Sequence, residues 1–216
     1  PERPSGSVER RREPAFPKLG RGIESGSSEE QALQIPDVQL ETERLLLRLP
    51  QAQDFEAWAA FMADVERTQY IGGAQPRSLA WRGLMTMVGS WAVLGFGMFS
   101  VIEKSSGRWI GRLGPWQPEG WPGTEIGWSI VSDAGGRGYA TEGATAAIDW
   151  AFDALGWSEV IHTIDPANAA SKGVAAKLGS RYQRMDRLPA PHDANEIEVW
   201  GQSREEWFTR RREQRQ

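Results

Sequence analysis

The chain contains no cysteine, which excludes disulfide bonds, thiolate metal sites and a cysteine nucleophile. A chain without disulfides suits a reducing compartment, so we expect a cytoplasmic location. The longest nearly apolar run, Trp91 to Phe99, is far shorter than the ~20 residues of a membrane-spanning helix. There are only two histidines, and the Asp, Glu and His spacing predicts no metal site. We therefore expect neither a membrane segment nor a bound metal.

Large regions of one charge are also missing. The net charge is −4, and Lys and Arg are scattered among Asp and Glu, so no nucleic-acid partner is expected.

Composition divides the chain into three parts. Residues 1–37 are rich in Pro, Gly, Arg and Glu and have the composition of a flexible tail, residues 38–202 form one domain, and residues 203–216 read as a charged helix. The cluster Arg10 to Arg12 has acidic neighbours and is interpreted as solvated charge.

Hydrophobic periodicity within the domain predicts alternating strands and helices. Helices are expected from Asp54, within 78–94, over 140–155 and from Asn168 to about Leu178. Strands are expected at 43–48, 97–103, 108–116, 125–131, 160–164, 181–187 and 196–201. This order predicts a mixed α/β fold, with antiparallel hairpins beside one strand-helix-strand unit.

A glycine-rich turn joins the strand at 125–131 to the helix that follows. Gly135, Gly136 and Gly138 let main-chain N–H groups converge on one point without side-chain obstruction. The start of the helix adds its unpaired N–H groups and positive dipole end, and Arg137 adds a full charge. These properties predict a site for a pyrophosphate.

Other interpretations of this turn lack specific residues. A P-loop needs a Gly-Lys-Ser/Thr ending, which is absent. A dinucleotide fingerprint has the spacing of Gly136 and Gly138, but Thr141 stands where its third glycine belongs. An ordinary strand-to-helix turn with incidental glycines also remains open.

The segment Trp128 to Thr141 resembles the acetyl-CoA-binding motif of the GNAT acetyltransferases, in particular the branch that acetylates ribosomal-protein N-termini and spermidine. Gly136 to Glu142, Gly-Arg-Gly-Tyr-Ala-Thr-Glu, carries the likeness, whereas Gly135 departs from it. A second segment, Asn168-Ala-Ala-Ser171 ending in Lys-Leu-Gly179, resembles the family's Asn-x-x-Ser segment, although Asn168 is also a plausible helix cap.

The resemblance implies the GNAT fold, a mostly antiparallel twisted central sheet flanked by helices, and acetyl-CoA as co-substrate. It implies that the main chain at the strand end binds the thioester oxygen and that the glycine turn and the second segment bind the rest of CoA. The cofactor-binding residues expected in this way are Ile130, Val131, Gly136, Arg137, Gly138, Tyr139, Ala140, Thr141, Asn168 and Ser171.

Acetyl transfer from a thioester needs a neutral amine, a site for the oxyanion and a proton for the leaving thiolate. Glu125 is the first candidate for the base, because it begins the motif strand and matches an acidic position of this branch. An exposed strand-end carboxylate is the alternative interpretation. Asp165 and His162 are substitutes, although a single strand histidine is more often structural. Ser171 is expected to protonate the thiolate, with Tyr182 as another donor.

We therefore expect an N-acetyltransferase that acts by direct attack in a ternary complex. The acceptor would be a primary amine, on a protein N-terminus or a small molecule, and the enzyme a monomer or homodimer. A non-catalytic CoA- or nucleotide-binding module of the same fold is the alternative, and a dinucleotide-dependent oxidoreductase is a third. Several tryptophans are candidates for the acceptor pocket, although core packing suits each one better: Trp109, Trp116, Trp121 and Trp128.

Overall fold

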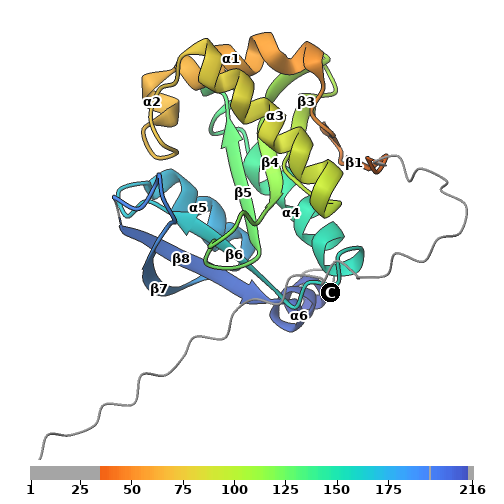
Figure 1. Ribbon diagram of the computed structural model, residues 1–216. Helices are drawn as coiled ribbons and strands as arrows, with labels where there is room; N and C mark the ends of the chain where they lie inside the picture. The colour runs from red at the N-terminus through yellow and green to blue at the C-terminus, as the bar shows by residue number, and fades with distance from the viewer. Residues whose placement is uncertain (1–34, 195, 214–216) are drawn as a thin grey trace, which may run out of the picture. The chain divides into compact units, whose positions relative to one another are not determined.

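An eight-stranded sheet forms the centre of residues 35–194 and 196–213, which are the residues that the computed structural model describes (Figure 1). Most of the expected tail and the Arg10 to Arg12 cluster lie outside these residues. The strands follow the order β1 (Gln39–Glu41), β2 (Leu45–Arg48), β3 (Phe99–Glu103), β4 (Arg108–Trp116), β5 (Glu125–Ile130), β6 (Glu159–Ile164), β8 (Glu196–Ser203) and β7 (Arg181–Arg187).

Neighbouring strands are antiparallel except for the pair β5 and β6, which is parallel. The parallel pair is registered only where Glu125 faces Ile161. Beyond that point the two strands run apart, as Figure 1 shows between β5 and β6. The sheet is therefore opened at its middle, and main-chain groups there face a gap in place of a partner strand.

Helices cover both faces of the sheet. On one face, α1 (Phe55–Ala63) and α3 (Arg77–Leu94) pack through Trp58, Phe61 and Leu84 against β3 and β4. On the other face, α4 (Tyr139–Asp153) packs through Ala144, Ile148 and Phe152, among others, against the central strands. The remaining helices are α2 (Val65–Thr68), α5 (Ala169–Leu178) and α6 (Arg204–Glu213). The mixed α/β fold with a mostly antiparallel sheet is confirmed.

Asp54 has a different role from the helix cap that its position predicts. Its carboxylate makes no capping bond to α1. It accepts two hydrogen bonds from Arg48 on β2, at 2.6 and 2.8 Å, and one from Ser100 on β3 at 2.7 Å. Because Asp54 is buried, these bonds compensate its charge and attach the start of α1 to the sheet.

Two short elements, β1 and α2, were not expected from the sequence. They are three and four residues long, too short for a periodic pattern to develop. Among the described residues, no helix combines the length and apolar character needed to cross a membrane.

Candidate active site

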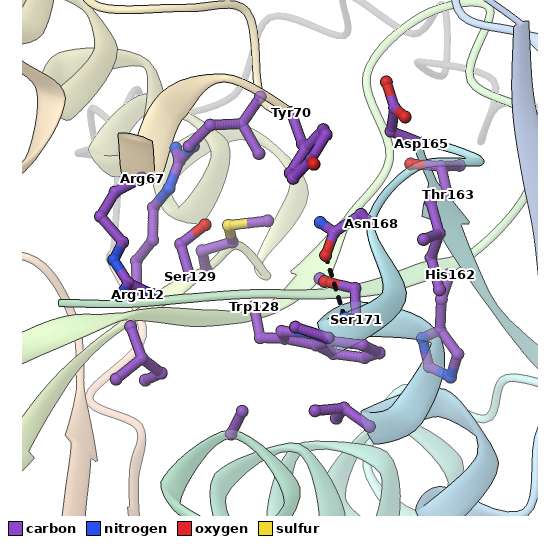
Figure 2. A pocket seen from close by; sticks show the side chains of 18 of the residues that line it. Arg67, Tyr70, Arg112, Trp128, Ser129, His162, Thr163, Asp165, Asn168 and Ser171 are labelled. Atoms are coloured by element: carbon purple, nitrogen blue, oxygen red, sulfur yellow. Dashed lines mark hydrogen bonds between the residues drawn. The ribbon is translucent and has the colours of Figure 1, made fainter. Parts of the chain in front are cut away.

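A cavity of about 1120 Å³ opens where β5 and β6 part. Its walls come from four parts of the fold. These are helices α1 to α3, strands β4 to β6, the glycine turn with the start of α4, and α5 with the segment that leads into β8. Figure 2 shows the interior, with Arg67, Arg112 and Ser129 on one side and Thr163 and Asp165 on the other. The cavity thus joins the glycine turn to the face of the sheet under α1 and α3.

The glycine turn has the conformation that its composition predicts. Gly136 and Gly138 have φ angles of 73° and 84°, in the left-handed region that favours glycine. No atom lies within 4 Å of the position that a Cβ of Gly136 would take, so the turn is open toward the cavity. Gly138 directly precedes α4, whose first residues Ala140 and Thr141 also line the cavity. The turn and the helix start thus lie together at the cavity wall, in the arrangement that suits an anion.

Gly135, the departure from the family pattern, does not loosen the turn. Its φ is −64°, and its N–H donates a 3.0 Å hydrogen bond to the Ser132 carbonyl. A Cβ at this position would lie 3.1 Å from that same carbonyl oxygen. Glycine here therefore permits tight closure of the turn.

The side chains of Arg137 and Tyr139 both contact Glu103 on β3, and Tyr139 also lines the cavity. The buried Tyr139 hydroxyl donates to Glu103 on β3 at 2.5 Å. The Arg137 guanidinium stacks over the Tyr139 ring, 5.1 Å from its centroid, and lies 3.6 Å from Glu103. Arg137 is not among the cavity-lining residues. Both side chains attach the turn to β3, so the expected charge of Arg137 is not in the cavity.

Arg67 supplies a positive charge at the turn instead. It lies on α2, and its Nε donates to the Ser132 hydroxyl at 2.5 Å. Its guanidinium nitrogens lie 3.6 and 3.8 Å from where a Cβ of Gly135 would be. Arg67 also lines the cavity. Sequence reasoning missed it, because nothing near Arg67 in the sequence signals a contact with a turn so far along the chain.

The two residues expected to bind the thioester oxygen differ in their main-chain bonds. The Val131 N–H donates to the Ile110 carbonyl of β4 at 2.9 Å, so it is already used. In an antiparallel pair such bonds alternate, and the registered pair Gly111 and Ile130 is therefore a non-hydrogen-bonded one. The Ile130 N–H consequently points away from β4, toward the gap beside β6. Ile130 lines the cavity and Val131 does not.

Asn168 and Ser171 meet at the start of α5. The Asn168 side-chain oxygen accepts the Ser171 N–H at 3.0 Å, the dashed bond in Figure 2, and so caps the helix. Both residues line the cavity beside the gap. The cap and the proposed binding role are compatible, because the cap fixes the Ser171 position at the cavity wall.

Glu125 lies buried in the cavity wall, not exposed at a strand end. Its carboxylate accepts hydrogen bonds from the Trp121 indole and from the N–H and hydroxyl of Thr163. Burial raises the pKa of Glu125 to about 7, although these bonds and the charge of Arg112 lower it in part. A carboxylate with a pKa near neutrality is suited to accept a proton from an acceptor amine.

His162 is a structural residue. Its Nδ1 lies 2.7 Å from the Ile126 carbonyl and its Nε2 lies 2.9 Å from the Ser180 hydroxyl. Because a carbonyl only accepts, Nδ1 carries the proton and Nε2 accepts from Ser180. Burial lowers the pKa of His162 to about 4, so the ring is neutral with both nitrogens engaged. It is not available as a base.

The structure also gives the positions of Asp165, the other substitute for the base, and Tyr182, the second candidate proton donor. Asp165 lines the cavity, but its Oδ1 accepts the Ala167 N–H at 2.8 Å and supports the turn before α5. Tyr182 is half exposed on the edge strand β7, packs on Trp200 and is not among the cavity-lining residues. Tyr182 is therefore not brought to the site.

Three of the four candidate tryptophans line the cavity, namely Trp116, Trp121 and Trp128. Trp109 is instead core, buried under α1 with its indole N–H on Ser100. Within the part of the chain that the structure describes, no group of His, Asp and Glu is arranged to hold a metal ion.

Comparison with known proteins agrees with this geometry. The family model described as "Acetyltransferase (GNAT) domain" matches residues 44–181. A crystal structure of an acetyltransferase from Agrobacterium tumefaciens is 30% identical, with a TM-score of 0.68, covering 82% of this chain and 100% of that one. The protein YkkB of Bacillus subtilis is 34% identical over 95 residues, which are 43% of this chain and 55% of YkkB.

A likeness at lower identity concerns the fold alone. The structure of Mycobacterium smegmatis RimJ in complex with CoA-disulfide is 19% identical, with a TM-score of 0.59, covering 75% of this chain and 83% of that one.

Proposed function

The chain belongs to the GNAT acetyltransferase family and uses acetyl-CoA, and on this basis we propose that it acetylates a primary amine by direct attack within a ternary complex. The observation that carries the proposal is the placement of Glu125. It lies on the same strand, β5, that leads into the glycine turn, and both line one cavity. A proton acceptor and an anion cradle are thus held in fixed relation by one strand.

We place CoA along the gap between β5 and β6. Its pyrophosphate would lie on the turn around Gly136 and Gly138, close to Arg67. The pantetheine arm would pass Asn168, and the thioester oxygen would accept the Ile130 N–H. Support comes from the open side of Gly136, the free direction of the Ile130 amide and the charge of Arg67.

In the reaction, Glu125 takes a proton from the acceptor ammonium, directly or through water, which leaves a neutral amine. The amine lone pair then forms a bond to the thioester carbon, and the oxyanion is held by the Ile130 N–H. The carbon–sulfur bond breaks, the nitrogen releases its second proton to the surrounding water, the thiolate takes a proton, and an amide and CoA result. Ser171, beside the gap, is proposed as the proton donor to the thiolate.

Two acceptor classes remain candidates, protein N-termini and small-molecule amines. The first is supported by the resemblance of the turn to the ribosomal-protein branch and by the fold shared with RimJ. The second is supported by the depth of the Glu125 carboxylate in the cavity wall. A monomeric or homodimeric state and a cytoplasmic location stay predictions.

Calorimetry with acetyl-CoA tests the cofactor site. Gly138→Trp adds a bulky side chain at a left-handed position of the turn proposed to hold the pyrophosphate, and it should abolish micromolar-range binding. Gly156→Trp is the matched control, because Gly156 also has a positive φ of 68°, has open space around it and is not among the residues that line the cavity. Equal loss of binding in both variants, or binding retained in Gly138→Trp, would contradict the placement.

Thiol release from acetyl-CoA with a panel of primary amines tests the transfer itself. We expect turnover with at least one class, and acetylated product by mass spectrometry. A protein that binds acetyl-CoA but acetylates neither N-terminal peptides nor small amines would contradict the proposed acceptors.

A further inference from the structure

Arg112 projects into the cavity without a partner. Among the described residues it makes no ion pair within 4.0 Å and no side-chain hydrogen bond, and its Nε is buried with no acceptor. Its guanidinium lies over the Trp58 ring of α1, 4.9 Å from the ring centroid. In Figure 2 it lies beside Ser129. A buried donor without an acceptor is unusual in folded proteins and calls for a ligand or another explanation.

A comparison with Arg48 shows how unusual this is within the same sheet. Arg48 on β2 is similarly shielded from solvent, and it forms a two-pronged ion pair with Asp54 at 2.6 and 2.8 Å. Arg112 on β4 has no such carboxylate. Burial lowers the pKa of Arg112 to about 10, yet the group is still charged at neutral pH. The fold thus keeps at the cavity wall a positive charge that has no ion-pair or hydrogen-bond partner among the described residues and interacts with Glu125 only at longer range, at a cost in stability.

Arg112 and Glu125 lie on one face of the sheet. The registered pairs Arg112 with Ser129 and Trp116 with Glu125 are four residues apart, so their side chains point to the same side. Gly127, midway along β5, has no side chain of its own between them; the Met98 methyl lies 2.7 Å and Glu125 Oε1 3.3 Å from where its Cβ would be. Met98 also lines the cavity, so a ligand that packs on the Met98 methyl at Gly127 can reach both charged groups.

We propose that Arg112 binds a carboxylate of the acceptor, so that the substrates are amines that also carry a carboxylate, such as amino acids. This inference rests on the proposed function, because it places the reacting amine at Glu125. The planar guanidinium, which lies over the Trp58 ring, presents a fork that matches a carboxylate. The phosphates of CoA have another site, at the glycine turn and Arg67.

The choice of a carboxylate over a dianionic phosphate follows from the local charges. One guanidinium faces the ligand, and the nearby Glu125 is negative when it acts as base. A dianion would be repelled by Glu125 more strongly than a carboxylate would. The aromatic walls, Trp116 and Trp121, provide apolar surface for the part of the substrate between the two polar ends.

The test compares ω-amino acids of increasing length with the corresponding amino amides. Initial rates of thiol release should give kcat/KM values on the order of 10- to 100-fold higher for an acid than for its amide, as expected for hydrogen bonds to charged groups. In Arg112→Gln this ratio should fall to about one, through KM, and Arg112→Lys should restore part of it. Acetyl-CoA affinity, measured by calorimetry, should stay at the wild-type value in both variants.

Calorimetry of acid and amide binding to the enzyme–CoA complex separates this inference from the proposed function. If amino acids bind in a way that depends on Arg112 but are not acetylated, the inference is sustained and acetyl transfer is contradicted. Turnover with equal preference for acids and amides would overturn the inference and leave the transfer standing. Weaker acetyl-CoA binding in both Arg112 variants would also overturn it, because Arg112 would then be a ligand of CoA. Arg112→Met should fold with little loss of stability, since the charge that it removes has no ion-pair or hydrogen-bond partner among the described residues.

Discussion

Thr163 on β6 donates to the Glu125 carboxylate on β5 from its N–H at 3.2 Å and from its hydroxyl, which lies 3.1 and 3.0 Å from the two carboxylate oxygens. The two strands are registered only at the pair Glu125 and Ile161. The carboxylate therefore lies where the two strands begin to separate. There it accepts a hydrogen bond from the Thr163 N–H, which does not pair with the main chain of β5. This position buries the carboxylate and leaves it facing the cavity.

We expect Glu125→Gln to lower kcat by on the order of 10² to 10⁴, the range for loss of a general base. In the wild type, kcat/KM should rise with pH and level off above about 7, because the base must be deprotonated and burial raises its pKa to about 7. The profile should be measured with an acceptor amine of low pKa, so that the amine itself does not titrate. Glu159→Gln on the exposed side of β6 is the control and should keep the wild-type profile. An unchanged profile in Glu125→Gln would show that another group is the base.

The same carboxylate should make stability depend on pH. Its pKa is raised by burial from 4.5 in the unfolded chain to about 7, so the folded state holds an extra proton between these values. The contribution of Glu125 to the free energy of unfolding therefore falls as the pH rises from 4.5 through 7. Glu125→Gln removes this loss and should be more stable than the wild type at pH 8, by at most about 3 kcal/mol, with little difference at pH 4.5. Urea unfolding of both proteins at the two pH values measures the difference. A difference of equal size at both would contradict the raised pKa.

We expect Arg67→Ala to weaken acetyl-CoA binding about tenfold, since its guanidinium is held at the glycine turn through Ser132. The rate at saturating acetyl-CoA should change much less than the affinity. Arg77→Ala is the control, because Arg77 is exposed at the start of α3 and paired with Glu56. Isothermal calorimetry at two salt concentrations checks the result, and the loss should shrink at high salt. Affinity unaffected by Arg67→Ala would place the phosphates elsewhere.

The features of the site that could be predicted from the sequence are those formed by residues that are neighbours along the chain. The glycine turn and the segment from Asn168 to Ser171 are each contiguous, and the structure brings both to the cavity. The order of strands and helices follows from periodicity for the same reason.

What could not be predicted depends on tertiary packing. Arg67 reaches the turn only because α2 packs near it, and the position of Arg112 under Trp58 of α1 depends on how α1 packs on the sheet. The different main-chain bonds of Ile130 and Val131 depend on the register of β5 against β4, which the sequence does not display. The position of the Arg137 side chain beside Glu103 could not be predicted either, because Glu103 lies on a strand distant in sequence.

His162 should matter for folding and not for proton transfer. His162→Ala leaves the Ile126 carbonyl without its donor and the Ser180 hydroxyl without its acceptor, so we expect a loss of about 2 to 4 kcal/mol in unfolding free energy. At a temperature where the variant is folded, kcat per acetyl-CoA-binding site should stay within a few-fold of the wild type. Burial lowers the pKa of His162 to about 4 in the folded state, so its contribution to stability is present above the unfolded value of 6.5 and is lost as pH falls toward 4. The wild type should therefore lose more stability than the variant over this range in parallel urea titrations. A fall in kcat as large as that expected for Glu125→Gln would instead make His162 part of the proton path and reduce Glu125 to a positioning residue.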